Sequence, residues 1–567
     1  MPFALQRKYS VMTVIIVMHS FFAQSQENNQ EKKPPNWWKR NFSINGGMGA
    51  NLMSYQAWGI PPRTRPGTWV MNANLNIRLG QFNMPLGVIF SEQERTFLQP
   101  FNQYGMSPGF KWMRAHVGYR SMTFSTYTLN GVVFLGGGIE LNPGKFRFSC
   151  MYGRINRAVA EDTLSDNRNL PAFKRMGLGA KIGWGDSKKY FDLIFFQSWD
   201  ELNSIPYVPQ KIRLTPEANK VFGLNNRFSK GKFYWENDGA LSLYTRDVRD
   251  SLTPIKTDYP TVNRIGEWIN PTISTQVSTA FHSTIGLQFN KFQLRIQYKR
   301  ISPNYRSLGT FYILGDMENI TVSPSFLFFK NTLRVALSAG YQRDNTSGFK
   351  YNTTVRSIGA CNISYTPNAN VSTEISINNF GTTQAPGLYP VDDTLRQYQV
   401  TRSINVMQRF GKNTKEFSKN FMITAAYQTF TDFNAESRSF LQNSVYTGAI
   451  NYNYSIVASK LSMGGGIMSN QITGDGFSSF QIGPTVNCSK GFMKNKITLN
   501  GGVSTLFNTN NGEAKGLNFN VNTSGNYRLT KRQRISAGLF AIRSNRFAGS
   551  TEKFTELRLN FGYNYSF

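Results

Sequence analysis

The side chains that could most readily take part in catalysis are a histidine and the serine beside it. His282 and Ser283 are adjacent in the sequence, and a histidine next to a serine nucleophile is an arrangement that hydrolases use. The segment around them alternates like a β-strand, with Phe281, Ser283 and Ile285 on the face opposite His282, so the two side chains should point apart. An outer-membrane hydrolase is therefore the least favoured of three functions, and His282 is expected to face a polar interior.

Other chemical signatures are absent from the sequence. It contains no HExxH pair, no GxxxxGK[ST] phosphate loop and no paired Cys and His ligands. Cys150, Cys361 and Cys488 are odd in number and widely spaced, which predicts small residues within strands, although one long-range disulfide stays open. We expect no catalytic residues, no metal and no cofactor.

The N-terminus indicates export. Arg7 and Lys8 precede an apolar stretch over residues 11–22, which is followed by the small residues of Ala23-Gln24-Ser25. This order predicts a signal peptide over residues 1–25, because the apolar stretch is too short to span a bilayer as a helix. Residues 26–41 are then expected to form a periplasmic tail.

The chain is strongly basic. Without Arg7 and Lys8 it has 61 basic and 32 acidic residues, a formal net charge of +29. Such a charge suits anions in a lumen, acidic lipid headgroups or an acidic partner, and it suits solvated turns equally well. Export makes nucleic acid an improbable partner.

The low hydropathy excludes spanning helices. After the export signal no apolar stretch approaches helical spanning length, and the mean hydropathy is −0.37. A membrane protein of such polarity must be a closed sheet, because every backbone polar group needs a partner in lipid. The alternative is a soluble secreted β-protein. The favoured fold class is all-β, a transmembrane antiparallel β-barrel over residues 42–567 in the outer membrane of a Gram-negative cell.

The C-terminal segment alternates most clearly. Leu557, Leu559, Phe561 and the assembly-signal candidates Tyr563, Tyr565 and Phe567 alternate with polar residues, as lipid-facing strands do. This segment resembles the C-terminal targeting strand that the barrel-assembly machinery recognises. Short turns and longer loops alternate along the chain and predict roughly 24 strands (22–26), in an even number.

The inner faces of these strands carry basic residues. The alternation directs the following candidates into the lumen: Arg78, Lys181, Arg295, Lys299, Arg334 and Arg558.

Residues 91–131 disturb the strand rhythm. They mix aromatic rings with cations, and the named candidates are Arg95, Lys111, Trp112, Arg114, His116 and Arg120. A barrel of 22 to 26 strands would enclose a very wide bore, so something should fill it. We expect this segment to fold inward and partly occlude the lumen. The alternative is another wall hairpin, since Met113, Ala115, Val117 and Tyr119 alternate.

The same region supports a resemblance. The residues that carry it are Asn102-Gln103-Tyr104-Gly105-Met106-Ser107-Pro108, Lys111-Trp112, Gly118-Tyr119-Arg120, Phe124-Ser125, Tyr127-Thr128-Leu129 and Glu140-Leu141-Asn142-Pro143-Gly144-Lys145-Phe146. This pattern of about 60 residues is similar to a large, poorly characterised family of outer-membrane barrels from Bacteroidota. The resemblance implies the fold and the location, and it supplies no catalytic residues.

Two functions remain open. The first is a channel, passive or gated, that leans toward anions because of the basic inner face. The second is a scaffold or accessory barrel in an envelope protein-assembly or secretion complex. TonB-dependent uptake is disfavoured, because the strands begin near Phe42 without a preceding plug domain. Expected partners are outer-membrane lipid and lipopolysaccharide, the barrel-assembly machinery and other envelope proteins.

Overall fold

The computed structural model describes residues 41–92, 102–161, 170–208, 213–253, 266–391, 396–546 and 553–567. The expected signal peptide and nearly all of the periplasmic tail lie outside these ranges, as does Arg95. Within the described ranges, no helix is long and apolar enough to cross a membrane.

Strands make up almost the whole structure. The short helical elements include η1 (Leu202–Ser204), η2 (Phe329–Asn331), α4 (Arg438–Leu441) and η3 (Met493–Asn495). The strands are β1 (Phe42–Trp58), β2 (Gly67–Leu79), β3 (Phe82–Ser91), β4 (Gln103–Met106), β5 (Gly109–Phe110), β6 (Met113–Thr123), β7 (Asn130–Leu141), β8 (Phe146–Asn156), β9 (Lys174–Gly185), β10 (Tyr190–Glu201), β11 (Ala218–Lys230), β12 (Phe233–Thr245), β13 (Thr275–Gln288), β14 (Phe292–Ile301), β15 (Met317–Phe328), β16 (Leu333–Arg343), β17 (Asn352–Asn368), β18 (Val371–Pro386), β19 (Tyr398–Asn413), β20 (Phe417–Asp432), β21 (Asn443–Ile456), β22 (Leu461–Gly474), β23 (Phe477–Phe492), β24 (Ile497–Asn510), β25 (Glu513–Arg528), β26 (Gln533–Arg546) and β27 (Phe554–Ser566).

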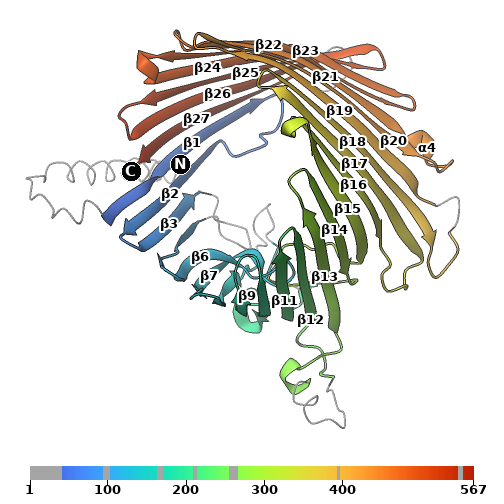
Figure 1. The fold of residues 1–567 in the computed structure, drawn as a ribbon. Helices are drawn as coiled ribbons and strands as arrows, with labels where there is room; N and C mark the ends of the chain where they lie inside the picture. The colour runs from blue at the N-terminus through green and yellow to red at the C-terminus, as the bar shows by residue number, and fades with distance from the viewer. Residues whose placement is uncertain are drawn as a thin grey trace, which may run out of the picture.

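These strands form one closed antiparallel barrel. Each strand pairs with the next in sequence, and β27 returns to pair with β1, with Phe561 opposite Leu52. The short segments β4 and β5 share one position between β3 and β6, so the 27 segments fill 26 positions. Figure 1 shows the first and last strands side by side. The predicted fold class is confirmed, and the even strand number lies at the upper end of the expected range.

The two faces of the sheet differ in chemistry. On β10, Phe191 and Leu193 are exposed, whereas Asp192 and Ile194 are buried on the opposite face. The register carries the same division from strand to strand around the barrel. Because most of the large exposed apolar side chains lie on one face, that face is the outer one and the other lines the lumen.

The two ends of the barrel differ in the length of their connections. The short turns, such as residues 142–145, 186–189 and 529–532, all lie at one end, which we call the turn end. The longer connections, residues 202–217, 246–274 and 302–316, lie at the loop end. Phe42 begins β1 at the turn end, and Phe567 follows β27 there.

The position shared by β4 and β5 corrects the prediction that residues 91–131 leave the wall. Residues 103–123 form wall strands, because β4 and β5 pair with β3 on one side and with β6 on the other. Ser107 and Pro108 interrupt the strand, and a proline cannot donate to the ladder. The Arg120 guanidinium donates to the carbonyls of Gly105 and Pro85 instead, which holds the broken strand in place.

The wall is uneven in length. Strands β6 to β16 have 10 to 14 residues, whereas β17 to β26 have 14 to 17. The shorter strands form one side of the barrel and the longer strands arch over the other (Figure 1). A closed sheet with an apolar outer face satisfies its backbone within lipid. The protein is a multi-pass β-barrel of the outer membrane.

The last residue gives a test of how the barrel closes. The Phe567 amide donates to the Gly46 carbonyl at 3.0 Å, and the Phe567 ring meets the Tyr565 ring edge-on at 4.9 Å. Deleting Phe567 removes both contacts, together worth about 2 kcal/mol, and should lower the fraction of heat-modifiable, membrane-inserted barrel on gels. Phe567→Tyr keeps the amide and the ring and should insert normally. Equal insertion of the deletion variant and the wild type would contradict this role.

Candidate functional site

Two loops fold into the lumen on the short side of the barrel. The β6–β7 loop, residues 124–129, and the β14–β15 loop, residues 302–316, both start at the loop end. Phe124, Tyr127 and Leu129 are buried in one hydrophobic cluster with Tyr305 and with inner-face side chains of β7 to β15. We call these two loops and the side chains beneath them the inner cluster.

Hydrogen bonds join the two loops. The Tyr305 hydroxyl donates to the Tyr127 carbonyl at 2.7 Å, and the Ser307 hydroxyl donates to the Thr128 carbonyl at 2.5 Å. The Asn130 amide donates to the Gly309 carbonyl at 2.9 Å. The loops therefore form one unit, although they lie about 180 residues apart in the sequence.

Further hydrogen bonds attach the inner cluster to the wall. The Thr126 amide donates to the Asp238 carboxylate of β12 at 2.8 Å. The Leu308 amide donates to the Asn219 side chain of β11 at 3.1 Å, and the Ser242 hydroxyl of β12 donates to the Arg306 carbonyl at 2.6 Å. Because these partners are buried, the contacts fix the loops against the wall rather than in open water.

Glycines on the inner face make room for the cluster. A Cβ added at Gly179 would lie 2.8 Å from the Phe124 ring, and one at Gly223 would lie 2.4 Å from the Thr128 methyl group. A Cβ at Gly309 would lie 2.7 Å from the Phe196 ring. Larger residues at these positions would displace the loops toward the lumen axis.

Burial changes the ionisation of the two tyrosines in the loops. The pKa of Tyr127 and the pKa of Tyr305 are both raised, first by burial and then by the nearby Asp238 carboxylate. Both phenols therefore stay protonated. The Tyr305 hydroxyl can act as the donor that holds the β6–β7 loop.

A charged network borders the inner cluster at the loop end. Arg175 contacts Asp200 at 2.7 Å and Glu217 at 2.6 Å. Glu217 also accepts from Arg306 of the inward loop at 2.7 Å and from the Tyr244 hydroxyl at 2.5 Å. Each charge in this network has a partner of opposite sign. Together these contacts connect β9, β10 and β12 to the β14–β15 loop.

The six predicted lumen cations all lie on the inner face by strand register, but they do not gather in one place. Lys181 lies over the Phe124 ring at 5.5 Å and so borders the inner cluster. Arg295 and Lys299 share β14, and Lys299 pairs in register with His282. The others are spread over three strands, in Arg78 of β2, Arg334 of β16 and Arg558 of β27.

The five candidates from residues 91–131 that the structure describes occupy the wall and its turn. Lys111 and Trp112 form the turn between β5 and β6, where Trp112 is half exposed. Arg114 and His116 face Glu140 across the β6–β7 pair, each at 3.8 Å. Among the described residues of this segment, only residues 124–129 fold inward, and none of the six candidates belongs to that stretch.

Ser107, His116 and Glu140 form a constellation that sequence reasoning did not find. The Ser107 hydroxyl lies 3.0 Å from His116 Nδ1, but His116 Nε2 is 3.8 Å from the Glu140 carboxylate, beyond hydrogen-bond distance. Ser107 and His116 are both buried beside the strand break. A nucleophile must meet substrate, so this group is better explained as support for the broken strand.

His282 and Ser283 point apart, as the alternation predicts. His282 Nε2 lies 2.9 Å from Thr284 Oγ1 and 2.6 Å from Gln297 Nε2 on the inner face. Ser283 accepts from the exposed Trp235 indole on the outer face at 3.0 Å. No group of three or more His, Cys, Asp or Glu side chains that could hold a metal ion occurs among the described residues.

The other side of the lumen is lined by amides, a feature that the sequence analysis missed. Inner-face asparagines recur on β20 to β25, β27, β1 and β2, and none of them is buried. We call this surface the amide wall, and its asparagines are Asn51, Asn72, Asn74, Asn76, Asn420, Asn451, Asn453, Asn470, Asn487, Asn500, Asn508, Asn518, Asn520, Asn522, Asn526, Asn560 and Asn564. The period-two recurrence of asparagine was the signal that could have revealed it.

Comparisons with known proteins find solved structures of low sequence identity and low TM-score. No family model matches the chain, and no curated protein matches it. The translocation pore of the P pilus usher PapC is 8% identical, with a TM-score of 0.36 over 92% of this chain and 99% of that chain. Pseudomonas aeruginosa OccK2 (OpdF), in complex with glucuronate, is 8% identical, with a TM-score of 0.29 over 92% and 98%. P. aeruginosa OccK9 (OpdG) is 10% identical, with a TM-score of 0.29 over 93% and 99%.

The charged network gives a test of what stabilises the short side. Arg175→Met leaves the buried Asp200 carboxylate and Glu217 without their main partner, which should cost about 3 kcal/mol and lower the temperature at which the heat-modifiable band converts. Arg249→Met is the control, because Arg249 pairs with Asp247 on the exposed loop and its loss should cost less than about 1 kcal/mol. Equal shifts for the two variants would show that the network adds no stability.

Proposed function

We propose that this protein is an outer-membrane channel with an anion preference, whose bore is narrowed on one side by the inner cluster. The observation that carries the proposal is the contrast between the two sides of the lumen. Inner-face side chains of the inner cluster, such as Phe196 and Val221, are fully buried, whereas the amide wall is accessible to solvent. A polar, accessible inner face is typical of barrels that hold water.

The width of the barrel supports a channel with a partial obstruction. Barrels of 16 to 18 strands already enclose an aqueous channel, and 22-stranded transporters carry a plug. This wall has 26 strand positions, and its two inward loops occupy the short side. Asparagine side chains on the opposite side offer both donors and acceptors to water and to polar solutes.

The inner face also favours anions. The six predicted cations project from it, and several inner acids are neutralised within the protein, as Asp192 is by Arg147 at 2.9 Å and Asp200 is by Arg175. Cations such as Arg295 and Lys299 have no carboxylate within ion-pair distance in the described part of the chain. An uncompensated positive inner face attracts anions into a pore.

The first test concerns the inner cluster. Replacing residues 124–129 by Asn-Gly should keep the β6–β7 hairpin, because Thr123 and Asn130 are paired neighbours and Asn-Gly suits a two-residue turn. Single-channel conductance in planar bilayers should then rise, since the largest inward loop side chains are gone. Removing residues 435–440 of the β20–β21 loop is the control and should leave the conductance unchanged.

An intact barrel and a shortened barrel that conduct equally would refute the narrowing by this loop. A barrel that inserts, stays silent in both forms and copurifies with fixed envelope proteins would refute the channel. That result would support the alternative function, a scaffold in an envelope assembly or secretion complex.

The second test concerns charge selectivity. The triple variant Arg295→Gln, Lys299→Gln, Arg334→Gln should lower the anion-to-cation permeability ratio about twofold or more, measured as the reversal potential in a salt gradient. Lys412→Gln with Lys415→Gln is the control, because these lysines lie at the turn end of the β19–β20 hairpin. An unchanged ratio in the triple variant would contradict the anion preference.

A further inference from the structure

The basic residues outside the strands are concentrated at one end of the barrel. Of the 12 hairpin turns at the turn end, 10 contain at least one Lys or Arg, and the only acids among them are Asp186 and Glu416. The basic residues of these turns are Lys111, Lys145, Lys188, Lys189, Lys232, Lys291, Lys330, Lys415, Lys460, Lys494, Lys496, Lys531 and Arg532. The turn end therefore carries 13 basic against 2 acidic side chains.

The loop end is nearly neutral by comparison. Its described loops contain 11 basic residues, Arg63, Arg65, Arg157, Arg213, Arg246, Arg249, Arg306, Lys350, Arg396, Arg438 and Lys553. They contain 10 acidic residues, Glu92, Glu161, Glu217, Asp247, Asp250, Glu267, Asp316, Asp344, Glu436 and Asp475. Among the described turns and loops, the excess positive charge therefore lies at the turn end.

Several of these cations lie over aromatic rings. Lys111 lies 5.3 Å from the centre of the Phe110 ring, and Lys232 lies 4.7 Å from the centre of the Phe289 ring. Lys419, at the start of β20, lies 5.5 Å from the Tyr454 ring on the outer face. Aromatic girdles mark the interface between hydrocarbon and headgroups, so the cations lie at headgroup level.

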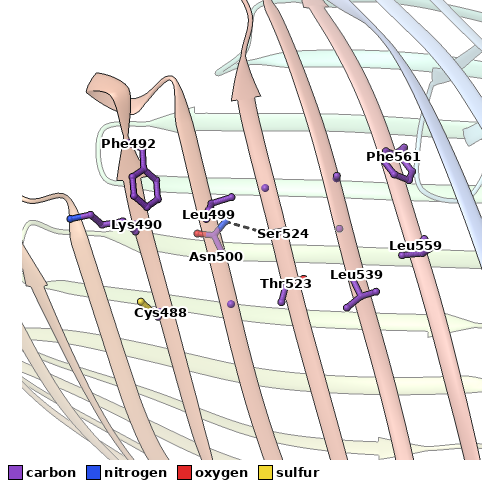
Figure 2. Close-up of a pocket in the computed structure, with 14 residues that line it drawn as sticks. Cys488, Lys490, Phe492, Leu499, Asn500, Thr523, Ser524, Leu539, Leu559 and Phe561 are labelled. Carbon is purple, nitrogen blue, oxygen red and sulfur yellow. Dashed lines mark hydrogen bonds between the residues drawn. The ribbon is translucent and has the colours of Figure 1, made fainter.

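An apolar groove opens on the outer face beside this cationic end. It has a volume of about 570 Å³ and crosses β23 to β27. Figure 2 shows Phe492 and Leu499 on one side of it, with Leu559 and Phe561 on the other. Its floor is formed by small residues, and a Cβ added at Gly501 would meet no atom within 4 Å. The groove is therefore a shallow depression in the lipid-facing surface, with open space above Gly501.

Cations stand at the turn-end border of the groove. Lys490 lines it, and the Lys490 ammonium donates one hydrogen bond to the Ser459 carbonyl at 2.7 Å, which leaves two N–H groups for another acceptor. Lys494 and Lys496 lie in the turn that follows Phe492. A second outer-face hollow of about 370 Å³ combines Lys419, Tyr454 and Gly465 in the same way.

We propose that the turn end binds anionic phospholipid of the adjacent leaflet, with one acyl chain in the groove over Gly501 and the phosphate held by Lys490, Lys494 and Lys496. Short turns face the periplasm in outer-membrane barrels, and that leaflet supplies the lipid. The binding does not depend on whether the barrel conducts.

Charge complementarity and shape select this occupant. Basic residues near an anionic lipid surface each add to binding, and an apolar hollow beneath a cation fits a molecule with a hydrocarbon chain below a phosphate. The cations encircle the barrel rather than forming one patch. Lipids surround the whole circumference of a barrel, whereas a single acidic protein would contact only part of that circumference.

The test uses the purified full barrel in non-ionic detergent, incubated with equal amounts of palmitoyl-oleoyl phosphatidylglycerol and phosphatidylcholine. Native mass spectrometry should show phosphatidylglycerol retained roughly tenfold over phosphatidylcholine. Lys490→Gln with Lys494→Gln and Lys496→Gln should reduce phosphatidylglycerol retention to near the phosphatidylcholine level. Gly501→Leu fills the hollow and should lower retention of both lipids, and Gly501→Val is a second variant with the same expectation.

The matched control removes three cations from the loop end, in the variant Arg65→Gln, Arg438→Gln, Lys553→Gln, and should keep the lipid preference. Equal retention of the two lipids by the wild type would overturn the proposal, as would an equal loss in the loop-end control or full retention in both Gly501 variants. Displacement of phosphatidylglycerol by excess glycerol 3-phosphate would assign the site to free phosphate esters and overturn the lipid assignment.

Discussion

The pairing of β27 with β1 is the contact on which the rest of the structure depends. It runs from Gly47 opposite Ser566 to Trp58 opposite Thr555. In hydrocarbon an unpaired strand edge would leave a row of N–H and C=O groups without partners. Closure removes both edges at once, and it also fixes the circumference at 26 strand positions. The other features of the structure follow from enclosing so wide a lumen within a single layer of β-sheet.

The two sides of the lumen are filled differently. On the short side, two loops from the loop end pack against inner-face glycines. There Tyr127, Leu129 and Phe196 are almost completely buried. Burial there is possible because the charges at the border are paired, as Arg175 is with Asp200 and Glu217. On the long side the inner face carries amides, which are uncharged and offer both donors and acceptors to water. One side of the lumen is thus packed like a protein core and the other is wetted like a pore.

Much of the barrel could be predicted from the sequence because strand alternation is a local signal. The alternation of Leu557 to Phe567 identified the last strand, and the same rule placed Arg78, Lys299 and Arg558 on the inner face. The inner cluster could not be found in this way, because the hydrogen bond from Tyr305 to Tyr127 joins residues 178 positions apart. The strand break at Ser107 and Pro108 made residues 91–131 resemble an insertion, although Arg120 restores the missing backbone contacts from a neighbouring strand.

Net charge alone was a poor guide to where the positive residues act. The net charge of +29, counted without Arg7 and Lys8, suits a basic lumen, a basic membrane surface or a basic docking face equally well. Strand register separates these cases, because it assigns every charged residue to the inner face, the outer face or one end. The turns of one end hold 13 basic and 2 acidic residues, whereas inner-face cations such as Arg147 are partly neutralised by acids such as Asp192. The proposed anion preference of the lumen therefore depends on a few inner-face cations without a carboxylate partner among the described residues, including Arg295 and Lys299. The excess charge of the turns acts instead on whatever surrounds the turn end.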